Sequence, residues 1–559
     1  MKKVSELALA IIKTSLARGV QDKDALSALK RELTRGSGRG LPTTTELRQA
    51  YETIIAADPA AANAGLDRLL RRRDVRSLSG VAIITVLTKP YPCPGRCLYC
   101  PTERNMPKSY LANEPAAMRA VDAGFDPWRQ VSRRLRALQG NGHPSDKIEL
   151  IVKGGTWSAY PWQYQQWFIK RCFDACNNFG GTVRRSPRTL AAAQVINETA
   201  THRVIGLTLE TRPDRITPTE IVRLRELGCT RVELGVQSVN DRLLLRVQRG
   251  HDAAAVIRAT RLLKDAGYKT DFHLMPQLPG ATPASDLRDL RTIFSDPGYR
   301  PDMIKVYPCV VLESAALYQE WKRGAYVPYS DRKLLELLIE FKTGVPPYCR
   351  ISRLIRDIPS TSIKAGNPVT NLRQDIARIM AERGLRCRCL RCREIGHAAK
   401  DRPALLAAAP KLFDLKYEAS GGLEHFLSFE DRSRRGVFAF CRLRLPGRDG
   451  VRERRSQGET ESGRDGVDRK KLYGLLPEIR GAAFLRELHT YGHLVPIAAH
   501  DPRASQHKGL GRRLMAEAER LAKKAGYKKL AVISGVGVRG YYRKLGYRRQ
   551  GTYMLKRLA

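Results

Sequence analysis

Long apolar runs are missing from this 559-residue sequence, and their absence narrows the class of protein. No stretch reaches the roughly 20 apolar residues that a membrane-spanning helix needs. Residues 1–6 also lack the apolar core of a secretory signal peptide. We therefore expect a cytoplasmic protein that does not bind a membrane.

Acidic residues are scarce relative to basic ones. Asp and Glu number 56 against 99 Lys and Arg, which gives a formal net charge of +43. A positive field of this size attracts polyanions and releases their counterions on binding, so nucleic acid is the leading class of partner. A generally arginine-rich proteome is the alternative origin of the charge.

Cysteine carries the first chemical signal. Twelve cysteines without a secretory signal predict reduced thiols, and clustered cysteines indicate metal binding. Cys93, Cys97 and Cys100 have the spacing C-x3-C-x2-C and follow the apolar run 81–87. Three such thiolates can ligate three irons of a 4Fe-4S cluster. A zinc loop with one ligand missing, or a structural cysteine-rich turn, is the alternative.

The fourth iron of such a cluster stays open for a substrate. S-adenosylmethionine can chelate it through its amine and carboxylate, and electron transfer then breaks the C–S bond to give a 5′-deoxyadenosyl radical. The cysteine spacing, with Tyr99 just before the third cysteine, resembles the radical-SAM signature.

Strands and helices alternate between residues 76 and 365. We expect six strands, at 81–87, 148–153, 203–210, 231–237, 270–276 and 303–311. Helices are expected between them, at 161–177, 218–227, 253–266 and 284–294. Parallel βα units of this kind predict a partial (β/α)6 barrel, and a doubly wound sheet is the alternative.

Polar and glycine residues follow the predicted strands, where such folds place their chemistry. Gly154 and Gly155 would let an adenosyl cofactor approach the backbone closely. Glu210 and Arg212 end the third strand, and Gln237 ends the fourth. Their recurrence predicts a rim that holds the sulfonium, amine or carboxylate of the cofactor.

A second cysteine group lies in the segment 366–410. Cys387, Cys389 and Cys392 have the spacing C-x-C-x2-C, which predicts a structural zinc site. His397, Cys349 or Cys309 would be the fourth ligand. The alternative is a basic loop with reduced cysteines, and in both cases the interleaved arginines suit phosphate contacts.

The last 150 residues change character. Strands are expected at 427–430, 437–443 and 484–491, and the charged, glycine-rich stretch 447–471 is expected to be a disordered insertion. Gln506, Gly509 and Gly511 then form a turn that opens a helix at 515–525, whose backbone N–H groups can bind a coenzyme pyrophosphate.

A strand at 529–534 and two adjacent tyrosines follow the glycine turn, which indicates an acyl-coenzyme A site. The hydroxyl of Tyr541 or Tyr542 could protonate the leaving thiolate, and we expect only one of the two to face the coenzyme. The amino-terminal residues 1–75 read as short basic helices, which either grip RNA phosphates or form a solvated cap.

The combination of Cys93, Cys97 and Cys100 with the turn 506–514 in one chain resembles the Elongator catalytic subunit family in its stand-alone bacterial or archaeal form. The resemblance covers essentially the whole chain. Further matching stretches are 145–147, 273–280, 371–374, 486–489 and 534–547.

We expect four parts: a basic helical tRNA-binding segment at 1–75, a partial barrel at 76–365, a metal-binding linker at 366–410 and a further domain at 411–559. The resemblance implies that the barrel is a radical-SAM domain and that the last part is a GNAT-type α+β acetyltransferase domain. The implied reaction forms 5-carboxymethyluridine at the wobble uridine of tRNA, with acetyl-CoA supplying two carbons and an electron donor reducing the cluster. The implied coenzyme contacts are Lys147, Glu487, Leu488, His489, Thr490, Leu510, Gly511, Arg512 and Tyr542.

Two features depart from the family pattern, because the 447–471 insertion is long and the second cysteine group is not shared by every branch. Two other function classes stay open. One is a protein lysine acetyltransferase with a structural iron–sulfur site, and the other is an RNA-binding scaffold. The sequence leaves open the tRNA isoacceptors, the electron donor and the oligomeric state, a homodimer included.

Overall fold

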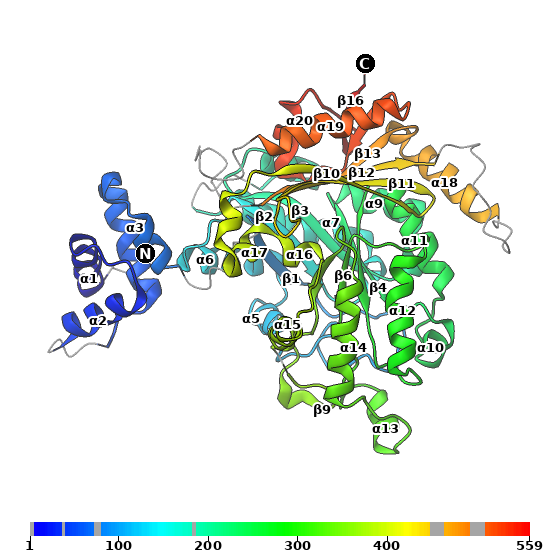
Figure 1. Cartoon of the computed structure of the whole chain (residues 1–559), viewed down its shortest axis with the longest axis horizontal. Coiled ribbons are helices and arrows are strands. Elements are labelled where there is room, and N and C mark those ends of the chain that lie inside the picture. Colours follow the sequence, from blue (N-terminus) through cyan, green and yellow to red (C-terminus); the bar gives the residue numbers. More distant parts are fainter. Residues whose placement is uncertain are drawn as a thin grey trace.

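The computed structural model describes residues 5–35, 40–71, 80–180, 186–369, 371–447, 463–491 and 509–558. Figure 1 shows a small helical part projecting from one side, a half-barrel in the centre and a second sheet across one end of it. None of the helices in these ranges combines the length and the apolar character that crossing a bilayer requires.

The amino-terminal part consists of helices, as predicted. They are α1 (Glu6–Ala17), α2 (Lys23–Thr34), α3 (Thr44–Ala57) and α4 (Ala64–Leu69). Thr43 and Glu46 form a capping box that fixes the start of α3. Ile11, Tyr51 and Leu66 belong to a small apolar core of this part alone. These helices therefore pack mainly on one another and stand apart from the rest (Figure 1).

The central sheet has seven parallel strands in the order in which the chain makes them. They are β1 (Ala82–Leu87), β2 (Lys147–Lys153), β3 (Arg203–Thr211), β4 (Arg231–Gln237), β5 (Lys269–Leu274), β6 (Met303–Val306) and β8 (Arg350–Arg353). In a doubly wound sheet the order in which successive strands are added reverses at a switch point. No such reversal occurs in this sheet, so that alternative is excluded. The partial barrel is confirmed, with β8 as a seventh strand that the sequence did not predict.

Helices lie between the strands of this sheet along the chain. They are α5 (Pro115–Asp122), α6 (Pro127–Gly140), α7 (Trp162–Asn177), α8 (Leu190–Asn197), α9 (Pro218–Glu226), α10 (Asp241–Arg246), α11 (Ala253–Asp265), α12 (Pro283–Ser295), α13 (Leu317–Lys322) and α14 (Asp331–Gly344). A small hairpin pairs β7 (Val311–Leu312) with β9 (Ile363–Ala365). The linker follows with α15 (Leu372–Glu382), α16 (Leu390–Arg393) and α17 (Ile395–Asp401).

The carboxyl-terminal sheet is mixed. Its strands are β10 (Lys411–Ala419), β11 (Gly422–Glu430), β12 (Val437–Pro446), β13 (Ala483–Thr490), β14 (Lys529–Val532), β15 (Arg548–Gln550) and β16 (Tyr553–Arg557). Its helices are α18 (Gly463–Leu475), α19 (Leu510–Lys524) and α20 (Arg539–Arg543). The parallel pairing of β13 with β14 covers only Ala483 to Leu485. The carboxyl half of β13 therefore separates from β14 beside the start of α19.

Two expectations for this domain need correction. The predicted disordered insertion was wrong for residues 463–471, because they belong to α18. That helix is anchored at its far end by Leu472 and Tyr473, which pack into the core. Residues 448–462 lie outside the described residues. The helix after the glycine turn begins at Leu510, five residues earlier than expected, because Gly509 in the left-handed region caps it.

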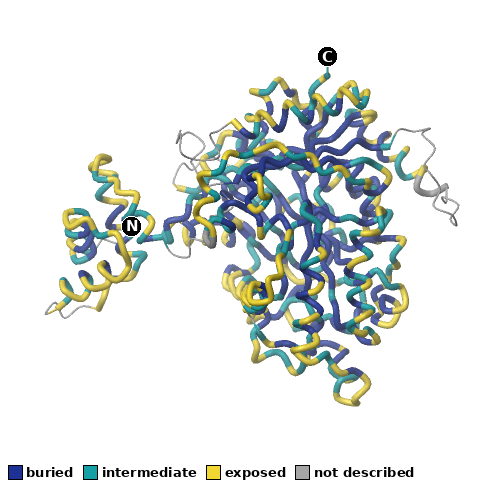
Figure 2. The backbone as a smooth tube through the Cα atoms, in the orientation of Figure 1, coloured by how far each residue is buried: buried dark blue, intermediate teal, exposed yellow. Residues whose placement is uncertain are grey.

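One apolar core runs through both sheets. Figure 2 shows the buried strands of the half-barrel continuing into those of the second sheet, with exposed helices around them. The first residues of β3 pack against the segment that follows β14: a Cβ at Gly535 would collide with the carbonyl group of Ile205. The second sheet thus closes the amino-terminal end of the half-barrel.

Candidate functional site

A cavity of about 720 Å³ lies inside the half-barrel and extends to the second sheet. Gln237, His273 and Met275 line it near the carboxyl ends of the strands. Leu488, His489 and Tyr541 line it from the second sheet and its helices. A single space therefore connects the cysteine end of the half-barrel with the predicted coenzyme site.

The three predicted cluster cysteines lie on the loop after β1. Cys97 is buried, and Cys93 and Cys100 are partly exposed. The sulfur of Cys93 lies 3.5 Å from the hydroxyl of Thr156, and Arg249 donates to the sulfur of Cys97 at 3.5 Å. Burial and the neighbouring Cys97 raise the pKa of Cys100 to about 11. The arginine gives the loop a buried cation that favours ionised thiolates.

Gly154 and Gly155 lie directly after β2, beside this loop, and both have positive φ angles, +135° and +82°. A Cβ at Gly154 would collide with Oγ1 of Thr88, which also accepts or donates a 2.7 Å hydrogen bond with the hydroxyl of Tyr160. Only glycine fits this combination of conformation and space. The two glycines predicted for the rim therefore directly follow β2, but neither of them lines the cavity.

Arg212 and Gln237 complete the rim. Arg212 donates to Asp214 at 2.8 Å and to the carbonyl of Gly250 at 3.1 Å, while its Nη1 is buried without a partner among the described residues. Gln237 has a φ of +73°, and its Oε1 is likewise unpartnered. Unsatisfied buried polar atoms are costly. Gln237 lines the cavity and Arg212 does not, so a ligand in the cavity would complete the amide oxygen of Gln237.

The interior of the half-barrel carries a charged network. Glu210 accepts from Lys153 at 2.9 Å, and His273 lies 3.3 Å from its other oxygen. Glu233 pairs with Lys305 at 2.5 Å, with His273 at 3.0 Å and with Lys153. The ligand atoms of Glu210, Glu233 and His273 lie within 4.8 Å of one another. The two lysines already neutralise the carboxylates, so the network needs no metal ion.

The pKa values of the groups in this network differ from their ordinary values. Burial alone would raise the pKa of Glu233, but Lys153 and Lys305 outweigh it and lower that pKa. Burial lowers the pKa of Lys305 to about 8 in spite of Glu233. Groups perturbed in this way inside a cavity are typical of a functional site.

The second sheet contributes Glu487, which lies between two cations. Lys269 of β5 donates to it at 3.2 Å and Arg442 of β12 at 2.8 Å. Burial would raise the pKa of Glu487, but these two cations lower it to about 2. His489 stacks on Phe440 with a centroid separation of 6.0 Å. The side chain of Glu487, a predicted coenzyme contact, therefore links the second sheet to the half-barrel through Lys269.

The start of α19 lies where the pyrophosphate site was predicted. Gly509 has a φ of +69°, and no side chain of the described residues caps the helix, so its first N–H groups have no side-chain acceptor in that part of the chain. A Cβ at Gly511 would lie 3.0 Å from the hydroxyl of Tyr541 and 3.7 Å from that of Thr490. Leu510 is buried beneath this turn, and Arg512 follows it. Gln506 lies outside the described residues.

The two adjacent tyrosines both line the cavity. Which of them would face the coenzyme stays a prediction. Tyr541 is 36% exposed, whereas Tyr542 is buried and packs edge-on against Tyr547. Burial raises the pKa of both hydroxyls. Lys147 begins β2 at the end of the half-barrel that the second sheet covers, but it does not line the cavity. Burial lowers the pKa of Lys147.

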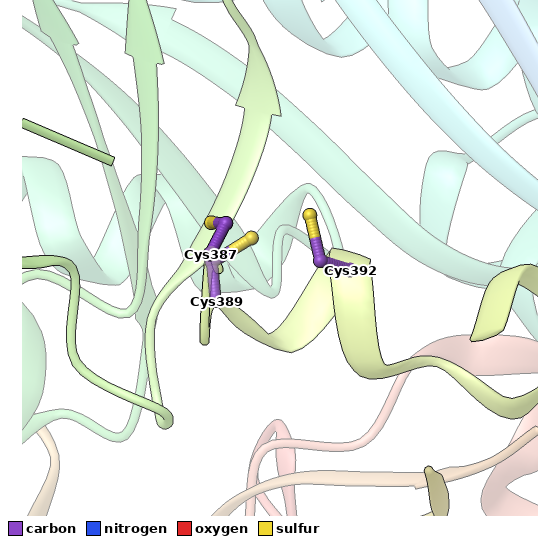
Figure 3. Close-up of side chains that lie close together, drawn as sticks. All are labelled: Cys387, Cys389 and Cys392. Atoms are coloured by element: carbon purple, nitrogen blue, oxygen red, sulfur yellow. The ribbon is translucent and has the colours of Figure 1, made fainter. Parts of the chain in front are cut away.

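The second cysteine group converges as predicted. Figure 3 shows Cys387, Cys389 and Cys392 turned toward one another, with Cys392 on α16, and their sulfurs lie within 4.8 Å of one another. Hydrogen bonds from Cys387 and Cys392 lower the pKa of Cys389. None of the proposed fourth ligands joins them within the part of the chain that the structure describes. His397 instead lies 3.4 Å from Glu394.

Lys153, Lys305, Asp271 and Arg249 were not predicted as site residues. Each alternates with apolar neighbours or follows a strand, so each looked like an ordinary polar residue. The available signal was that charged residues stand at every second position inside strands that are buried on both faces, as at Asp271 and His273 of β5. Such charges in a buried strand indicate a polar interior.

Family models match the chain in three places. The Radical SAM superfamily model matches residues 91–291, the Radical_SAM C-terminal domain model matches 301–382 and the acetyltransferase (GNAT) domain model matches 478–556. These matches imply S-adenosylmethionine and a 4Fe-4S cluster for the half-barrel and fit acetyl-CoA in the second domain.

Curated relatives cover most of the chain. A tRNA uridine(34) acetyltransferase of Methanocaldococcus infernus is 44% identical over 499 residues, 88% of this chain and 88% of that protein. One from Methanocaldococcus jannaschii is 41% identical over 96% of this chain and 94% of its own length. Elongator complex protein 3 of Homo sapiens is 38% identical over 90% of this chain and 89% of its own.

A solved structure supports the same assignment. The archaeal Methanocaldococcus infernus Elp3 with an N-terminal deletion superposes with a TM-score of 0.70 at 40% identity. The match covers 86% of this chain and all of that one.

Proposed function

Because the chain belongs to the family of the tRNA uridine(34) acetyltransferases and Elongator complex protein 3, and is a radical SAM enzyme with an acetyltransferase domain, we propose that it forms 5-carboxymethyluridine at the wobble uridine of tRNA. Acetyl-CoA supplies the two-carbon unit. A methyl carbon and a pyrimidine ring carbon react poorly by polar chemistry, so joining them needs a radical initiator. Hydrolysis of the thioester then releases coenzyme A.

The observation that supports this function best is the single cavity lined by both domains. If the two domains worked on separate substrates, each would need its own site. Here Gln237 at the rim and His489 of the second sheet line the same space of about 720 Å³, which has the size of a typical ligand site. A thioester held at α19 can therefore share one chamber with a radical formed at the rim.

The residues at the rim fit the cluster and its cofactor. We assign Cys93, Cys97 and Cys100 to three irons of a 4Fe-4S cluster. Each thiolate ligates a different iron, so these sulfurs need not converge as tightly as those around a single ion. When bound, the cluster and S-adenosylmethionine supply the deoxyadenosyl radical, for which a separate electron donor is needed. Gly154, Gly155, Arg212 and Gln237 would then hold the cofactor, and the Nη1 of Arg212, which has no partner among the described residues, lies against Gly95 of the cysteine loop.

The opposite end of the cavity fits acetyl-CoA. The uncapped start of α19 at Gly509 to Arg512 would bind the pyrophosphate, and the separating carboxyl half of β13, from Glu487 to Thr490, would offer backbone groups to the pantetheine arm. The hydroxyl of Tyr541 or Tyr542 would protonate the thiolate that leaves on hydrolysis. Lys147 would contact the coenzyme from the half-barrel.

The tRNA substrate would be recruited by the +43 charge and by the basic helices at 1–75. A base inside an anticodon loop is reached by turning it out of its stack into a pocket. We further assign one structural zinc ion to Cys387, Cys389 and Cys392, since their sulfurs converge as the ligands of a single tetrahedral ion must.

The test is a reaction under anaerobic conditions. Reconstituted, reduced protein is incubated with tRNA, S-adenosylmethionine and acetyl-CoA, and the tRNA nucleosides are analysed by mass spectrometry. We expect 5-carboxymethyluridine at position 34, formed by the wild type and by the matched control Cys176→Ser, whose buried thiol lies on α7 away from the cavity. The Cys97→Ser variant should give none.

Two outcomes would contradict the proposal. Unmodified uridine with an intact cluster would exclude the reaction. Acetyl transfer to protein lysines that needs no tRNA and survives Cys97→Ser would instead support the lysine acetyltransferase with a structural iron–sulfur site.

A further inference from the structure

Asp271 is a buried carboxylate that the reaction described above does not use. It is fully buried on β5, lines the cavity, and neither of its oxygens has a hydrogen-bond partner among the described residues. An ionisable group without hydrogen bonds in a protein interior is expensive. Its position on the cavity wall indicates that a ligand supplies the missing donor.

Two cationic side chains flank Asp271 on the neighbouring strands. Nη2 of Arg231 on β4 forms an ion pair with Glu149 at 2.7 Å. The buried Nε of Arg231 has no hydrogen-bond partner in the described part of the chain. Lys305 of β6 forms an ion pair with Glu233, with 2.5 Å between Nζ and the carboxylate oxygen, and its ammonium carries three N–H donors. Both residues line the cavity, and the charges of both act on Asp271.

The strand register places these three residues on a diagonal. Asp271 pairs in register with Glu233 on β4 and with Met303 on β6. Arg231 pairs with Lys269, two residues before Asp271 on β5. Lys305 pairs with His273, two residues after Asp271. The cavity wall therefore presents donor, acceptor and donor in sequence across β4, β5 and β6. We name this set Arg231–Asp271–Lys305 the diagonal triad.

Uracil has the complementary edge. Its N3–H donor lies between two carbonyl acceptors, O2 and O4. Cytosine presents an acceptor at N3, which the carboxylate of Asp271 would repel. Acetyl-CoA has no N–H group at its thioester, so the coenzyme cannot satisfy the carboxylate there. We propose that the diagonal triad binds the Watson–Crick edge of the target uridine, with Asp271 accepting from N3–H, and so selects uridine over cytidine.

The route into the cavity fits an RNA ligand. The half-barrel is open between its edge strands β1 and β8, and Ile83 and Ser352 from these two edges line the cavity. Arginines also line it from β8 and from helices and loops: Arg119, Arg134, Arg353, Arg356 and Arg391. Guanidinium groups at the entrance suit the phosphates on either side of an inserted nucleotide. The inference rests on the proposed tRNA modification and names how its substrate base is read.

The sharpest test alters the RNA, because it does not disturb the protein fold. A tRNA with 3-methyluridine at position 34 has lost the N3–H donor. We expect its modification by the wild-type enzyme to be at least about 100-fold slower than that of uridine, since a site built around a hydrogen bond rejects an analogue that lacks it. A tRNA with the same methylation in the D-loop is the control and should react normally. Equal rates for both methylated tRNAs would overturn the inference.

The protein side is tested with Asp271→Asn, which keeps the size of the side chain but offers N3 of cytosine a donor. Modification of uridine-34 tRNA should fall about 10- to 100-fold, and the preference over cytidine-34 tRNA should fall at least about tenfold. Asp174→Asn removes an equally buried carboxylate outside the cavity and should keep the full preference. An unchanged preference in Asp271→Asn would overturn the inference.

Adenine also has an N–H group between two ring acceptors, so the cofactor is the competing ligand. Binding of S-adenosylmethionine by Asp271→Asn, measured by calorimetry, should stay within about twofold of the wild type. A loss of that binding would overturn the assignment to uridine. If the wild type did not modify even unmethylated tRNA, the proposed function itself would be wrong. If it modified uridine and 3-methyluridine equally well, only the assignment of the diagonal triad to the base would be wrong.

Discussion

Arg486 of β13 and Asp302, directly before β6, form a doubly hydrogen-bonded salt bridge between the two domains. Nη1 of the arginine donates to one carboxylate oxygen at 2.7 Å and Nη2 to the other at 2.6 Å, and neither side chain is exposed. Burial would raise the pKa of Asp302, but Arg486 and Arg442 outweigh it and lower that pKa strongly. The pair fixes the second sheet on the half-barrel, and so fixes the two ends of the shared cavity.

Asp302→Asn should destabilise the protein strongly. Removal of one partner from a buried pair leaves the other charge without compensation, at a cost of about 3–5 kcal/mol. Urea unfolding measures the loss. The matched control is Glu340→Gln, which breaks an exposed pair with Arg291 and should cost about 0–1 kcal/mol. A loss below about 1 kcal/mol for Asp302→Asn would show that the interface does not depend on this pair.

Much of the half-barrel could be predicted because its strands are apolar runs of the right length. β8 was missed because Arg350–Arg353 has only one apolar residue, Ile351, in four. It is recognised as a strand only through its pairing with β6. β10 was also missed, although from Asp414 onward its charged residues alternate with single apolar ones, which is a strand pattern; the strand is largely exposed or half-buried.

The rim of the site could also be predicted, because glycines and polar residues at strand ends follow from the fold class alone. The interior could not. The contacts of Glu233 with Lys153 and Lys305 join residues 80 and 72 positions apart, and they depend on the register of neighbouring strands. A single sequence gives the strands but not their register, so the charged network and the diagonal triad appear only in three dimensions.

Glu487→Gln should change how stability depends on pH. The pKa of Glu487 is about 2 in the folded protein and about 4.5 when unfolded, so its ionised form stabilises the fold above pH 4.5 and this contribution is lost as the pH falls toward 2. Between pH 6 and pH 3 the wild type should lose about 2 kcal/mol more than the variant, measured by urea unfolding at each pH. Glu336→Gln, which removes an exposed carboxylate on α14, should follow the wild-type curve. Parallel curves for wild type and Glu487→Gln would contradict the assigned pairing with Lys269 and Arg442.

Cys389→Ser should remove the second metal site. Cys389 is the buried member of the group with the lowered pKa, so it is the thiolate that binds a cation best. We expect the zinc content, measured by atomic absorption, to fall from about one ion per chain to none, with a lower melting temperature. Cys349→Ser is the control, because Cys349 does not join the converging sulfurs, and it should keep its zinc. Zinc retained by Cys389→Ser would place the metal elsewhere.

Gly154→Ala should weaken the binding of S-adenosylmethionine. The methyl group would collide with Thr88, whose backbone nitrogen lies only 3.2 Å from the Cβ position, and alanine at a φ of +135° is strained by about 1–3 kcal/mol. The rim must move to relieve both. We expect binding of S-adenosylmethionine to weaken at least tenfold by calorimetry, and the yield of 5′-deoxyadenosine to fall with it.

The control for this variant separates strain from the loss of space at the rim. Gly124 also has a positive φ, +60°, but nothing lies within 4 Å of its Cβ position. Gly124→Ala should therefore cost about 1 kcal/mol of stability and leave cofactor binding unchanged. If Gly154→Ala bound S-adenosylmethionine as tightly as Gly124→Ala does, the backbone after β2 would not contact the cofactor, and the rim would have to be assigned to other residues.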